Sequence, residues 1–453
     1  MATIVRSRPA AVHRPAADWQ PEDAAFWERT GAATARRNLV LSVLTGHIGM
    51  SVWSLWSVLV LFLGPQYHID ASGKFVLTAV PTACGALLRV PWTFAVARFG
   101  GRNWTVVSCV LFLVPTVLTG IVLRPGVHYG TLLAVSVVAG VGGANFSSSI
   151  ANMNGFYPQR LKGWALGVTA GGGNLGVPAV QLVGLLVLAT AGAAHPRVLL
   201  AVYLPLIVLA AAGAALGMDN LGSADRAGSA RGALRAAARD RDCWLVSALY
   251  LGAFGSFIGF AFAFGQVLEV EFHRQFATPV QAACVTFVGP LLGSLTRPLG
   301  GMLADRRGGA VVTGWTFAGM SGSAAVVLLA SERHSLPLFL GGFLLLFALS
   351  GLGSGATYKL IPELYRTRAL RALAAGADPA ATERAAKLGA SALIGISGAV
   401  GSFGAVLVEA AFRQSFLDAH DGNPAYLAFL GYYGFCLLLV RRRYPGPRSR
   451  RRT

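Results

Sequence analysis

The amino-acid sequence predicts an all-α membrane protein in which twelve transmembrane helices form two pseudo-symmetric halves of six. The first observation behind this prediction is composition: 54% of the 453 residues are hydrophobic and only 13% are charged, whereas soluble domains carry about 25% charged residues. The second is the length of the apolar stretches, since a helix needs about 20 such residues to cross the hydrocarbon core. The third is a pair of motifs that recur at fixed offsets, as in membrane proteins built from internal repeats.

Twelve apolar stretches meet this length. They are predicted at residues 38–64, 74–97, 104–123, 130–156, 163–190, 197–218, 244–268, 279–304, 310–331, 336–361, 387–411 and 424–440. The chain accordingly divides into a cytoplasmic N-terminal segment (1–37), a first six-helix half (38–218), a cytoplasmic linker (219–243), a second six-helix half (244–440) and a basic cytoplasmic tail (441–453). The motif Trp19…Phe26-Trp27 makes the first segment amphipathic, so we expect it either to lie on the membrane surface or to be a solvated linker.

Positive charge alternates between successive loops. The formal net charge is +19. Of the 38 lysine and arginine residues, 29 fall in the N-terminal segment, in the loops after the even-numbered stretches (with Lys387 at the edge of the eleventh stretch) and in the C-terminal tail. This distribution is the positive-inside pattern, which places both termini in the cytoplasm. The basic tail is then expected to anchor the chain at the anionic inner leaflet. The charge therefore indicates a lipid bilayer, and no nucleic acid, as the partner.

The first recurring motif is a glycine-rich helix. Residues 163–182 carry a face of small residues with an amide side chain, Asn174, beside it. Residues 395–404 repeat this pattern 228 positions later. Small residues let membrane helices approach closely, so both segments are expected to slide past their neighbours. The glycines concerned are Gly167, Gly171, Gly172, Gly173 and Gly176 in the first copy and Gly395, Gly398, Gly401 and Gly404 in the second.

The second recurring motif is an intramembrane arginine. Arg89 lies in the second stretch, and Arg297 lies in the eighth, 208 positions later. Arg89 lies about ten residues, or roughly 15 Å, from the cytoplasmic end of its stretch, which is close to the midplane. Arginine stays protonated when it is buried, and a charge at the bilayer centre costs from ~3 to over 10 kcal/mol. Each arginine therefore requires a partner.

The partner expected for the two arginines is an anion. No Asp or Glu falls in the central part of any predicted stretch, and the nearest ones lie near stretch ends, namely Asp305, Glu363, Glu269 and Glu409. Planar guanidinium groups suit a small planar oxyanion that is held in a bidentate fashion from both sides. Asn174 and Tyr250 could add polar contacts to such a site, and Phe146 and Phe254 could wall it.

An anion site of this kind favours exchange. Two positive charges that face each other in an empty cavity resist closure of the halves, because their repulsion and desolvation are uncompensated. A bound anion removes this barrier. His47 and Lys359 are candidates for proton coupling and keep proton symport open as the alternative. The five cysteines lack paired spacing, so neither a metal site nor a cofactor is indicated, and no nucleophile–base pair suggests an enzyme.

At these positions the sequence resembles the nitrate/nitrite porter family of the major facilitator superfamily. Residues 163–182 resemble that family's first signature and residues 395–404 its second, and the likeness extends to Asn145-Phe146, to 250–257 and to 351–359. The resemblance implies the major facilitator fold and a secondary-active transporter of nitrate and nitrite in the bacterial cytoplasmic membrane. It also implies that a monomer is functional.

The resemblance further implies roles for particular residues. Those that would hold the anion are Arg89 and Arg297 as a clamp, Asn174 and Tyr250 as polar contacts, and Phe146 and Phe254 as sandwiching rings. The glycines of the fifth and eleventh helices would let these helices move. The loop with Asp305, Arg306 and Gly308 would form a cytoplasmic latch, which is expected to be weaker in the first half because Ala97 replaces the acid.

The sequence departs from the family at one place, and several functions stay open. Ser402 and Phe403 interrupt the second signature, where paired small residues are usual. Transport is expected as nitrate/nitrite antiport, because no central carboxylate is present, or as nitrate/proton symport. The short loops argue against a transporter-like sensor or channel. An organic-anion carrier would require bulky carboxylates to compete better than nitrite.

Overall fold

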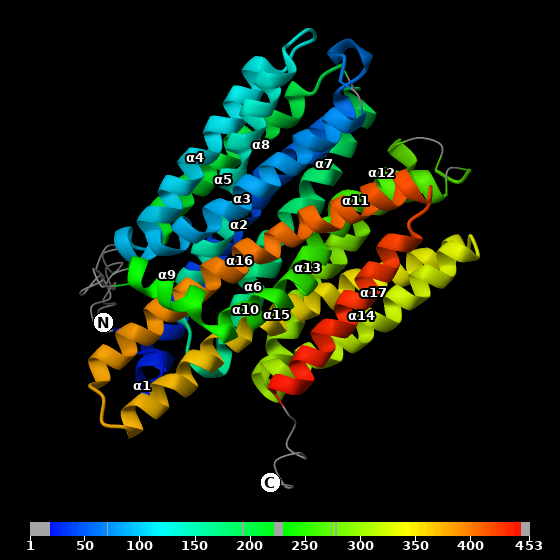
Figure 1. The fold of residues 1–453 in the computed structure, drawn as a ribbon. Coiled ribbons are helices and arrows are strands. Elements are labelled where there is room, and N and C mark those ends of the chain that lie inside the picture. The colour runs from blue at the N-terminus through cyan, green and yellow to red at the C-terminus, as the bar shows by residue number, and fades with distance from the viewer. Residues whose placement is uncertain are drawn as a thin grey trace, which may run out of the picture.

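The protein is a bundle of long helices, and its computed structural model describes residues 19–69, 71–192, 194–221, 230–272, 274–276 and 279–444. Within these ranges the chain is helical apart from short connections (Figure 1). Eleven of the described helical segments are long and apolar enough to cross a membrane. The prediction of an all-α membrane protein is therefore confirmed.

The helices follow the predicted spans with shifted ends. The first half contains α1 (Ala24–Phe26), a π-helix (Trp27–Gly31), α2 (Ala32–Leu59), α3 (Ala71–Phe99), α4 (Gly101–Val122), α5 (Tyr129–Phe156), α6 (Lys162–Asn174), α7 (Gly176–Thr190) and α8 (Arg197–Gly217), with short 3₁₀ turns at Val60–Phe62, Pro65–Tyr67 and Gln159–Leu161. The predicted linker contains α9 (Ala230–Arg239). The second half contains α10 (Arg241–Tyr250), the π-helix η5 (Leu251–Gly255), α11 (Ser256–Glu271), α12 (Pro279–Thr286), α13 (Val288–Arg307), α14 (Gly309–Glu332), α15 (Leu336–Ala374), α16 (Pro379–Asp418) and α17 (Asn423–Arg443).

The predicted span missing from those eleven is the eighth, residues 279–304. It is formed by α12 and α13, which are separated at Phe287. α13 carries Arg297 and ends on the charged residues Asp305, Arg306 and Arg307. These charges make its composition too polar for a membrane helix judged by hydropathy alone, although its place in the bundle is that of a span.

Two predicted spans are broken in the middle, and a proline explains each break. α6 ends at Asn174 and α7 begins at Gly176. Pro178 has no N–H to donate to the carbonyl of Asn174, four residues earlier. In the same way Pro290 cannot donate to Thr286, the last residue of α12. Each span therefore has a one-residue interruption, at Leu175 and at Phe287, where the backbone keeps right-handed helical φ and ψ angles.

Two aligned glycines share an unusual backbone conformation. Gly100 precedes α4 with a φ of +86°, and Gly308 joins α13 to α14 with a φ of +87°. Glycine enters this region readily, while residues with a Cβ do so at a steric cost. The offset of 208 residues therefore relates two turns of the same shape, which supports the pseudo-symmetry of the halves.

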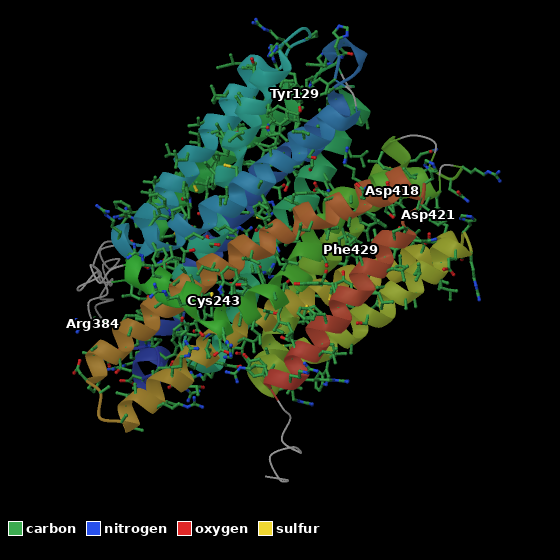
Figure 2. The ribbon with its side chains drawn as sticks, in the orientation of Figure 1. Tyr129, Cys243, Arg384, Asp418, Asp421 and Phe429 are labelled. Atoms are coloured by element: carbon green, nitrogen blue, oxygen red, sulfur yellow. The ribbon has the colours of Figure 1, made fainter. Side chains whose placement is uncertain are left out.

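The two halves meet along two sets of helices. α6 packs against α13 and α15, and α3 packs against α16. Figure 1 shows the early helices, coloured blue to cyan, on one side of the molecule and the late helices, coloured yellow to red, on the other. α16 runs the length of the bundle, because Arg384 near its start and Asp418 at its end lie at opposite ends of the molecule (Figure 2).

The described part of the N-terminal segment packs against the protein. The ring of Trp19 lies edge-on to Phe26 and Phe156 at 5.2 Å from each, and its indole N–H donates to the Phe156 carbonyl at 3.2 Å. Glu22 accepts from the backbone N–H of Gln159 at 2.8 Å. At Trp19 and Glu22 the expectation of a solvated linker is therefore corrected, while a position at the membrane surface stays a prediction. Residues 1–18 lie outside the described part.

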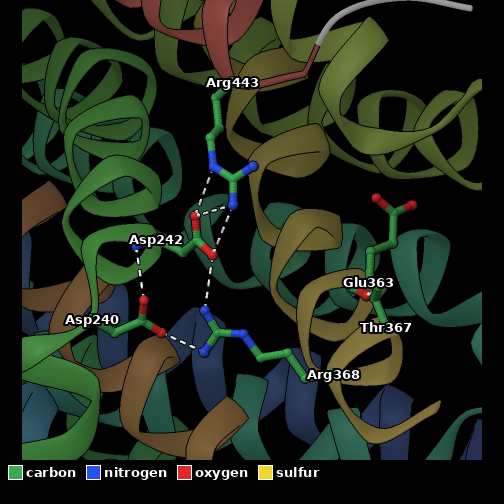
Figure 3. A network of polar contacts seen from close by, with 6 residues as sticks. All are labelled: Asp240, Asp242, Glu363, Thr367, Arg368 and Arg443. Carbon is green, nitrogen blue, oxygen red and sulfur yellow. Dashed lines mark hydrogen bonds and ion pairs between the residues drawn. The ribbon is translucent and has the colours of Figure 1, made fainter. Parts of the chain in front are cut away.

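An ion network ties three helices together at the predicted cytoplasmic end (Figure 3). The Asp242 carboxylate accepts from Arg368 of α15 at 2.8 Å and from Arg443 of α17 at 3.1 Å. Arg368 also donates to Asp240, and this hydrogen bond holds the pKa of Asp240 below its ordinary value. The network explains why α15 continues as an ordered helix well past the predicted end of its span at residue 361.

Replacing Asp242 by alanine is expected to lower stability, because Arg368 and Arg443 both lose an acceptor. Hydrogen bonds to charged groups contribute about 1.5–3 kcal/mol, and partial exposure of both arginines reduces this to about 1–2 kcal/mol. The measurement is the apparent melting temperature of the purified protein. Glu383→Ala is the control, since it removes only the exposed ion pair with Lys387. Equal melting temperatures for the two variants would contradict a stabilising role of the network.

Candidate functional site

The two intramembrane arginines lie at one place in the structure. Arg89 of α3 and Arg297 of α13 are both fully buried. The Cζ atom of Arg89 lies 4.6 Å from the ring centroid of Phe146 and 5.0 Å from that of Phe254. The Cζ atom of Arg297 lies 5.1 Å from each of the same two centroids. One arginine from each half therefore shares the same pair of aromatic faces.

Neither arginine has a carboxylate partner among the described residues. Arg89 donates to the carbonyls of Gly143 and Gly398, each at 3.2 Å, and Arg297 donates to the Tyr250 hydroxyl. Three guanidinium nitrogens make no hydrogen bond in the described part of the chain, namely Nη2 of Arg89 and Nε and Nη1 of Arg297. The site thus combines two positive charges with unused N–H donors, which is the chemistry of an anion-binding site.

A π-helix contains or adjoins the two aromatic residues that the second half was predicted to contribute to the site. η5 follows directly after Tyr250 and includes Phe254, and their rings stack at 5.0 Å with an interplanar angle of 5°. Phe146 of α5 stacks on Phe254 at 5.5 Å. Single π-helical turns are frequent at functional sites. Cations over aromatic faces are stabilised by about 0.5–2 kcal/mol, so these rings partly offset the burial of both arginines.

Asn174 lies at the break between α6 and α7. It is fully buried, and both atoms of its side-chain amide have no hydrogen-bond partner among the described residues. It is one helical turn from Gly171, where an added Cβ would lie 3.3 Å from the Cβ of Arg297. An unpartnered buried amide is costly, so Asn174 has donor and acceptor capacity to offer to a ligand.

The glycines of the first copy serve two contact surfaces. A Cβ added at Gly167 would lie 3.0 Å from the Arg297 carbonyl oxygen, and one at Gly171 would lie 2.5 Å from the Ser294 carbonyl oxygen. These two glycines therefore bring α6 against α13 of the other half. The remaining three face α2 in their own half: a Cβ at Gly172 would meet Val43, one at Gly173 would meet Gly46, and one at Gly176 would meet the His47 carbonyl.

The glycines of the second copy divide in the same way. A Cβ at Gly395 would lie 3.2 Å from Thr93 of α3, and one at Gly398 would lie 2.7 Å from the Ser147 hydroxyl of α5. These two glycines face the first half. A Cβ at Gly401 would meet the Tyr250 ring, and one at Gly404 would meet Gly255, so both face the neighbouring helices of the second half. In each copy the first glycines lie between the halves.

Asp305 joins the two halves at the predicted cytoplasmic end. Its carboxylate accepts from the backbone N–H groups of Gly163 at 3.0 Å and Trp164 at 2.7 Å, in the first turn of α6. It also pairs with Lys359 at 2.7 Å, and Lys359 donates to the Gln159 carbonyl at 2.6 Å. A carboxylate is stabilised at a helix N-terminus by the free N–H groups and the helix dipole. These contacts hold α6, α13 and α15 together.

The rest of this loop, and its counterpart in the first half, make different contacts. Arg306 is exposed, and Gly308 provides the turn into α14. In the first half Ala97 supplies no carboxylate, and Arg102 instead donates to the Ala215 carbonyl of α8 at 2.9 and 2.6 Å. That loop is therefore tied within its own half, while the Asp305 loop reaches across.

His47 and Lys359, the two candidates for proton coupling, have different surroundings in the structure. The ring of His47 lies beside the backbone of Gly172, between α2 and α6. Lys359 is engaged by Asp305 and Gln159, as described above. Neither makes a described hydrogen bond to Arg89 or Arg297. Their proposed role in proton coupling stays a prediction.

Glu409 is a buried carboxylate that the sequence analysis placed near the end of a span. The predicted span ended at 411, but α16 continues to Asp418, so Glu409 lies about 14 Å from the helix end. It is 2% exposed, and neither carboxylate oxygen has a hydrogen-bond partner among the described residues. An unpaired buried carboxylate is costly when ionised. Glu409 is therefore a group that can hold a proton inside the bundle.

Three further residues at the site were not selected from the sequence. The indole of Trp53 lies 5.4 Å from the Cζ atom of Arg89. Ser147 and Tyr358 are buried, and their hydroxyls have no hydrogen-bond partner in the described part of the chain. The signal that could have identified the last two is the clustering of polar residues at 145–149 and 351–359, inside otherwise apolar spans.

Comparison with known proteins identifies clear relatives. Residues 41–402 match the model of the Major Facilitator Superfamily. The chain is 36% identical over 447 residues to the nitrate/nitrite transporter NarU of Salmonella typhimurium, covering 93% of this chain and 94% of that protein. It is 32% identical over 372 residues to the probable nitrate/nitrite antiporter NarK2 of Thermus thermophilus, covering 78% and 83%. The solved fucose:proton symporter FucP of Escherichia coli has the same fold, with a TM-score of 0.64 at 12% identity, covering 91% of this chain and 100% of that chain.

The glycines of α6 allow a matched test of close packing between the halves. Gly171→Ala is expected to lower stability by about 1–3 kcal/mol, the usual range for overpacking, because its Cβ would lie 2.5 Å from a backbone oxygen of α13. Gly173→Ala places its Cβ no nearer than 3.6 Å to any atom, so alanine's higher helix propensity is expected to leave stability equal or greater. Apparent melting temperatures measure both effects. Equal destabilisation by the two substitutions would contradict the assignment.

Proposed function

Since the chain belongs to the major facilitator superfamily, and within it to the family of nitrate/nitrite transporters, we propose that it exchanges nitrate for nitrite by alternating access. The observation that carries the proposal is the pair of fully buried arginines that share the faces of Phe146 and Phe254 and have no carboxylate partner among the described residues. A small anion supplies the missing negative charge. Nitrate and nitrite are planar and accept parallel N–H donors of the kind that guanidinium presents.

The proposed anion site uses donors that are free of protein partners. Nη2 of Arg89 and Nε and Nη1 of Arg297 would each offer an N–H to the anion, so that both arginines contact it. Asn174 adds an amide donor, and Tyr250 adds a hydroxyl that already contacts Arg297. Phe146 and Phe254 lie against both guanidiniums and would exclude water from the bound anion, which strengthens each charged contact.

The proposed transport cycle uses the contacts between the halves. The Asp305–Lys359 pair and the first turn of α6 form the latch that keeps the predicted cytoplasmic end closed. Gly167 and Gly171 on α6, with Gly395 and Gly398 on α16, let the halves rock against each other without side chains in the way. Closure with both arginines uncompensated is unfavourable, so we propose that the halves reorient mainly with an anion bound. That requirement produces antiport.

The proposed placement in the membrane follows from the charge distribution. We propose that the chain lies in the bacterial cytoplasmic membrane with both termini in the cytoplasm, because basic residues accumulate in the loops of that face. The two moving halves would be residues 38–218 and 244–440, joined by a linker at 219–243. The bound partners would be nitrate, nitrite and the lipid bilayer. One chain contributes both arginines, so a monomer would suffice.

Counterflow with purified protein in vesicles tests the function. Vesicles loaded with nitrite are expected to take up labelled nitrate, and vesicles without an internal anion are expected to take up little. Arg89→Lys and Arg297→Lys should each reduce counterflow by about tenfold or more, because lysine keeps the charge but loses the planar fork. Arg98→Lys is the control, because Arg98 lies at the end of α3 with its guanidinium over Phe99. Uptake by Arg89→Lys at the wild-type rate would contradict the proposal.

A second candidate function, nitrate/proton symport, is favoured by one observation. Glu409 is buried with both carboxylate oxygens unpartnered in the described part of the chain, and a protonated carboxyl is the form that such surroundings favour. If Glu409 binds and releases a proton in each cycle, a proton would accompany the anion. We give antiport precedence because the arginine pair itself has no acid beside it.

Replacing Glu409 distinguishes nitrate/nitrite antiport from nitrate/proton symport. Under antiport, an acidic exterior leaves nitrate/nitrite counterflow unchanged, and Glu409→Gln behaves as wild type. Under symport, an acidic exterior drives nitrate into anion-free vesicles, and Glu409→Gln abolishes that uptake. Glu271→Gln is the matched control, because Glu271 is also an acid of the second half but its carboxylate already accepts from Tyr426 at 2.6 Å. We expect the first result.

A further inference from the structure

Tyr358 presents an unused hydroxyl to the candidate anion site. It lies on α15 with 1% of its surface exposed. Its ring lies 4.5 Å from that of Tyr250 and 6.2 Å from that of Phe146, and the Cζ atom of Arg297 lies 5.7 Å from its centroid. The Tyr358 hydroxyl makes no hydrogen bond of ordinary geometry among the described residues. The Tyr250 hydroxyl, which Arg297 already engages, lies close enough to interact with it.

Ser147 presents a second unused hydroxyl from the other half. It lies on α5, is fully buried, and has no hydrogen-bond partner in the described part of the chain. Serines in membrane helices usually donate to a carbonyl three or four residues earlier. Ser148 does so to Asn145 at 2.8 Å, and Ser397 does so to Leu393 at 2.7 Å. Ser147 therefore keeps its hydroxyl available, as does Ser149 two residues further along α5.

Gly398 brings these two hydroxyls together beside Arg89. A Cβ built at Gly398 would lie 2.7 Å from the Ser147 hydroxyl oxygen and 3.5 Å from both the Tyr358 hydroxyl oxygen and the Cδ atom of Arg89. Two buried hydroxyls, one from each half, thus lie within 3.5 Å of a single point next to one of the two guanidiniums. The glycine leaves room there that any other residue would fill.

We propose that the hydroxyls of Ser147 and Tyr358 bind the third oxygen of nitrate and so make the site prefer nitrate to nitrite. This inference rests on the proposed function, in which the two arginines engage the anion from both sides. Nitrate has three oxygens in one plane and nitrite has two, so donors beyond the arginine forks have an acceptor only in nitrate. A site built to hydrogen-bond one substrate group discriminates against an analogue that lacks it, because the donors are then left unpaired.

Binding of both anions to the purified full-length protein, measured by titration calorimetry, tests the inference. Tyr358→Phe is expected to raise the Kd for nitrate about five- to tenfold, the effect of one lost hydrogen bond, and to change the Kd for nitrite less than about twofold. Ser147→Ala is expected to act in the same direction. Tyr433→Phe is the matched control, because its buried hydroxyl donates to Ser256 at 2.7 Å. It should leave the nitrate-to-nitrite ratio unchanged.

Each other outcome has a defined meaning. If Tyr358→Phe weakens both anions equally, or if its effect disappears in a Tyr250→Phe background, Tyr358 acts only by positioning Tyr250 and the inference is wrong. If neither Tyr358→Phe nor Ser147→Ala changes the ratio, it is also wrong. Ser147→Ala keeps the test valid should Tyr358→Phe fail to fold. Failure of the proposed function would look different, because the wild-type protein would then bind neither anion.

Discussion

Two permanently charged side chains in an apolar interior constrain the whole structure. A charge at the bilayer centre costs from ~3 to over 10 kcal/mol, and both Arg89 and Arg297 are fully buried. The protein offsets part of this cost with the faces of Phe146 and Phe254, two backbone carbonyls and one tyrosine hydroxyl. These groups come from α5, α10, η5 and α16, and the arginines themselves come from α3 and α13, so helices of both halves meet at one point.

The cost of burying these charges also explains which features could be predicted from the sequence. An arginine inside an apolar stretch stands out because its burial is so costly, and its recurrence after 208 residues identifies the pair. Glycine runs stand out for a related reason, since helices that approach within backbone contact tolerate no larger residue. Gly171 and Gly398 occupy such contacts. The two halves of six helices followed from composition and the repeated motifs, and the sandwiching role of the aromatic residues followed from the family resemblance. The comparisons confirm the family.

Other features depend on contacts that a sequence does not reveal. The Asp305 carboxylate meets the first turn of α6, more than a hundred residues away along the chain. The π-helix after Tyr250 arises without proline, and helical periodicity alone does not distinguish it from an α-helix. Pro178 was visible, but a proline can kink a helix or end it, and the neighbours decide which. Glu409 was placed too close to a helix end because its helix continues beyond the predicted end of the span at residue 411, as far as Asp418.

Because α16 is long, it connects the central site to the surface of the molecule. This helix runs without interruption from Pro379, next to the turn that joins it to α15, past Gly398 at the arginine pair. About 19 residues separate those two points, which is roughly 28 Å of helix. A tilt of about 10° around Gly398 would displace the start of the helix by about 5 Å. A small rotation of α16 around the anion would therefore be amplified into a larger displacement of the hairpin between α15 and α16. A label placed on this hairpin would report each turnover.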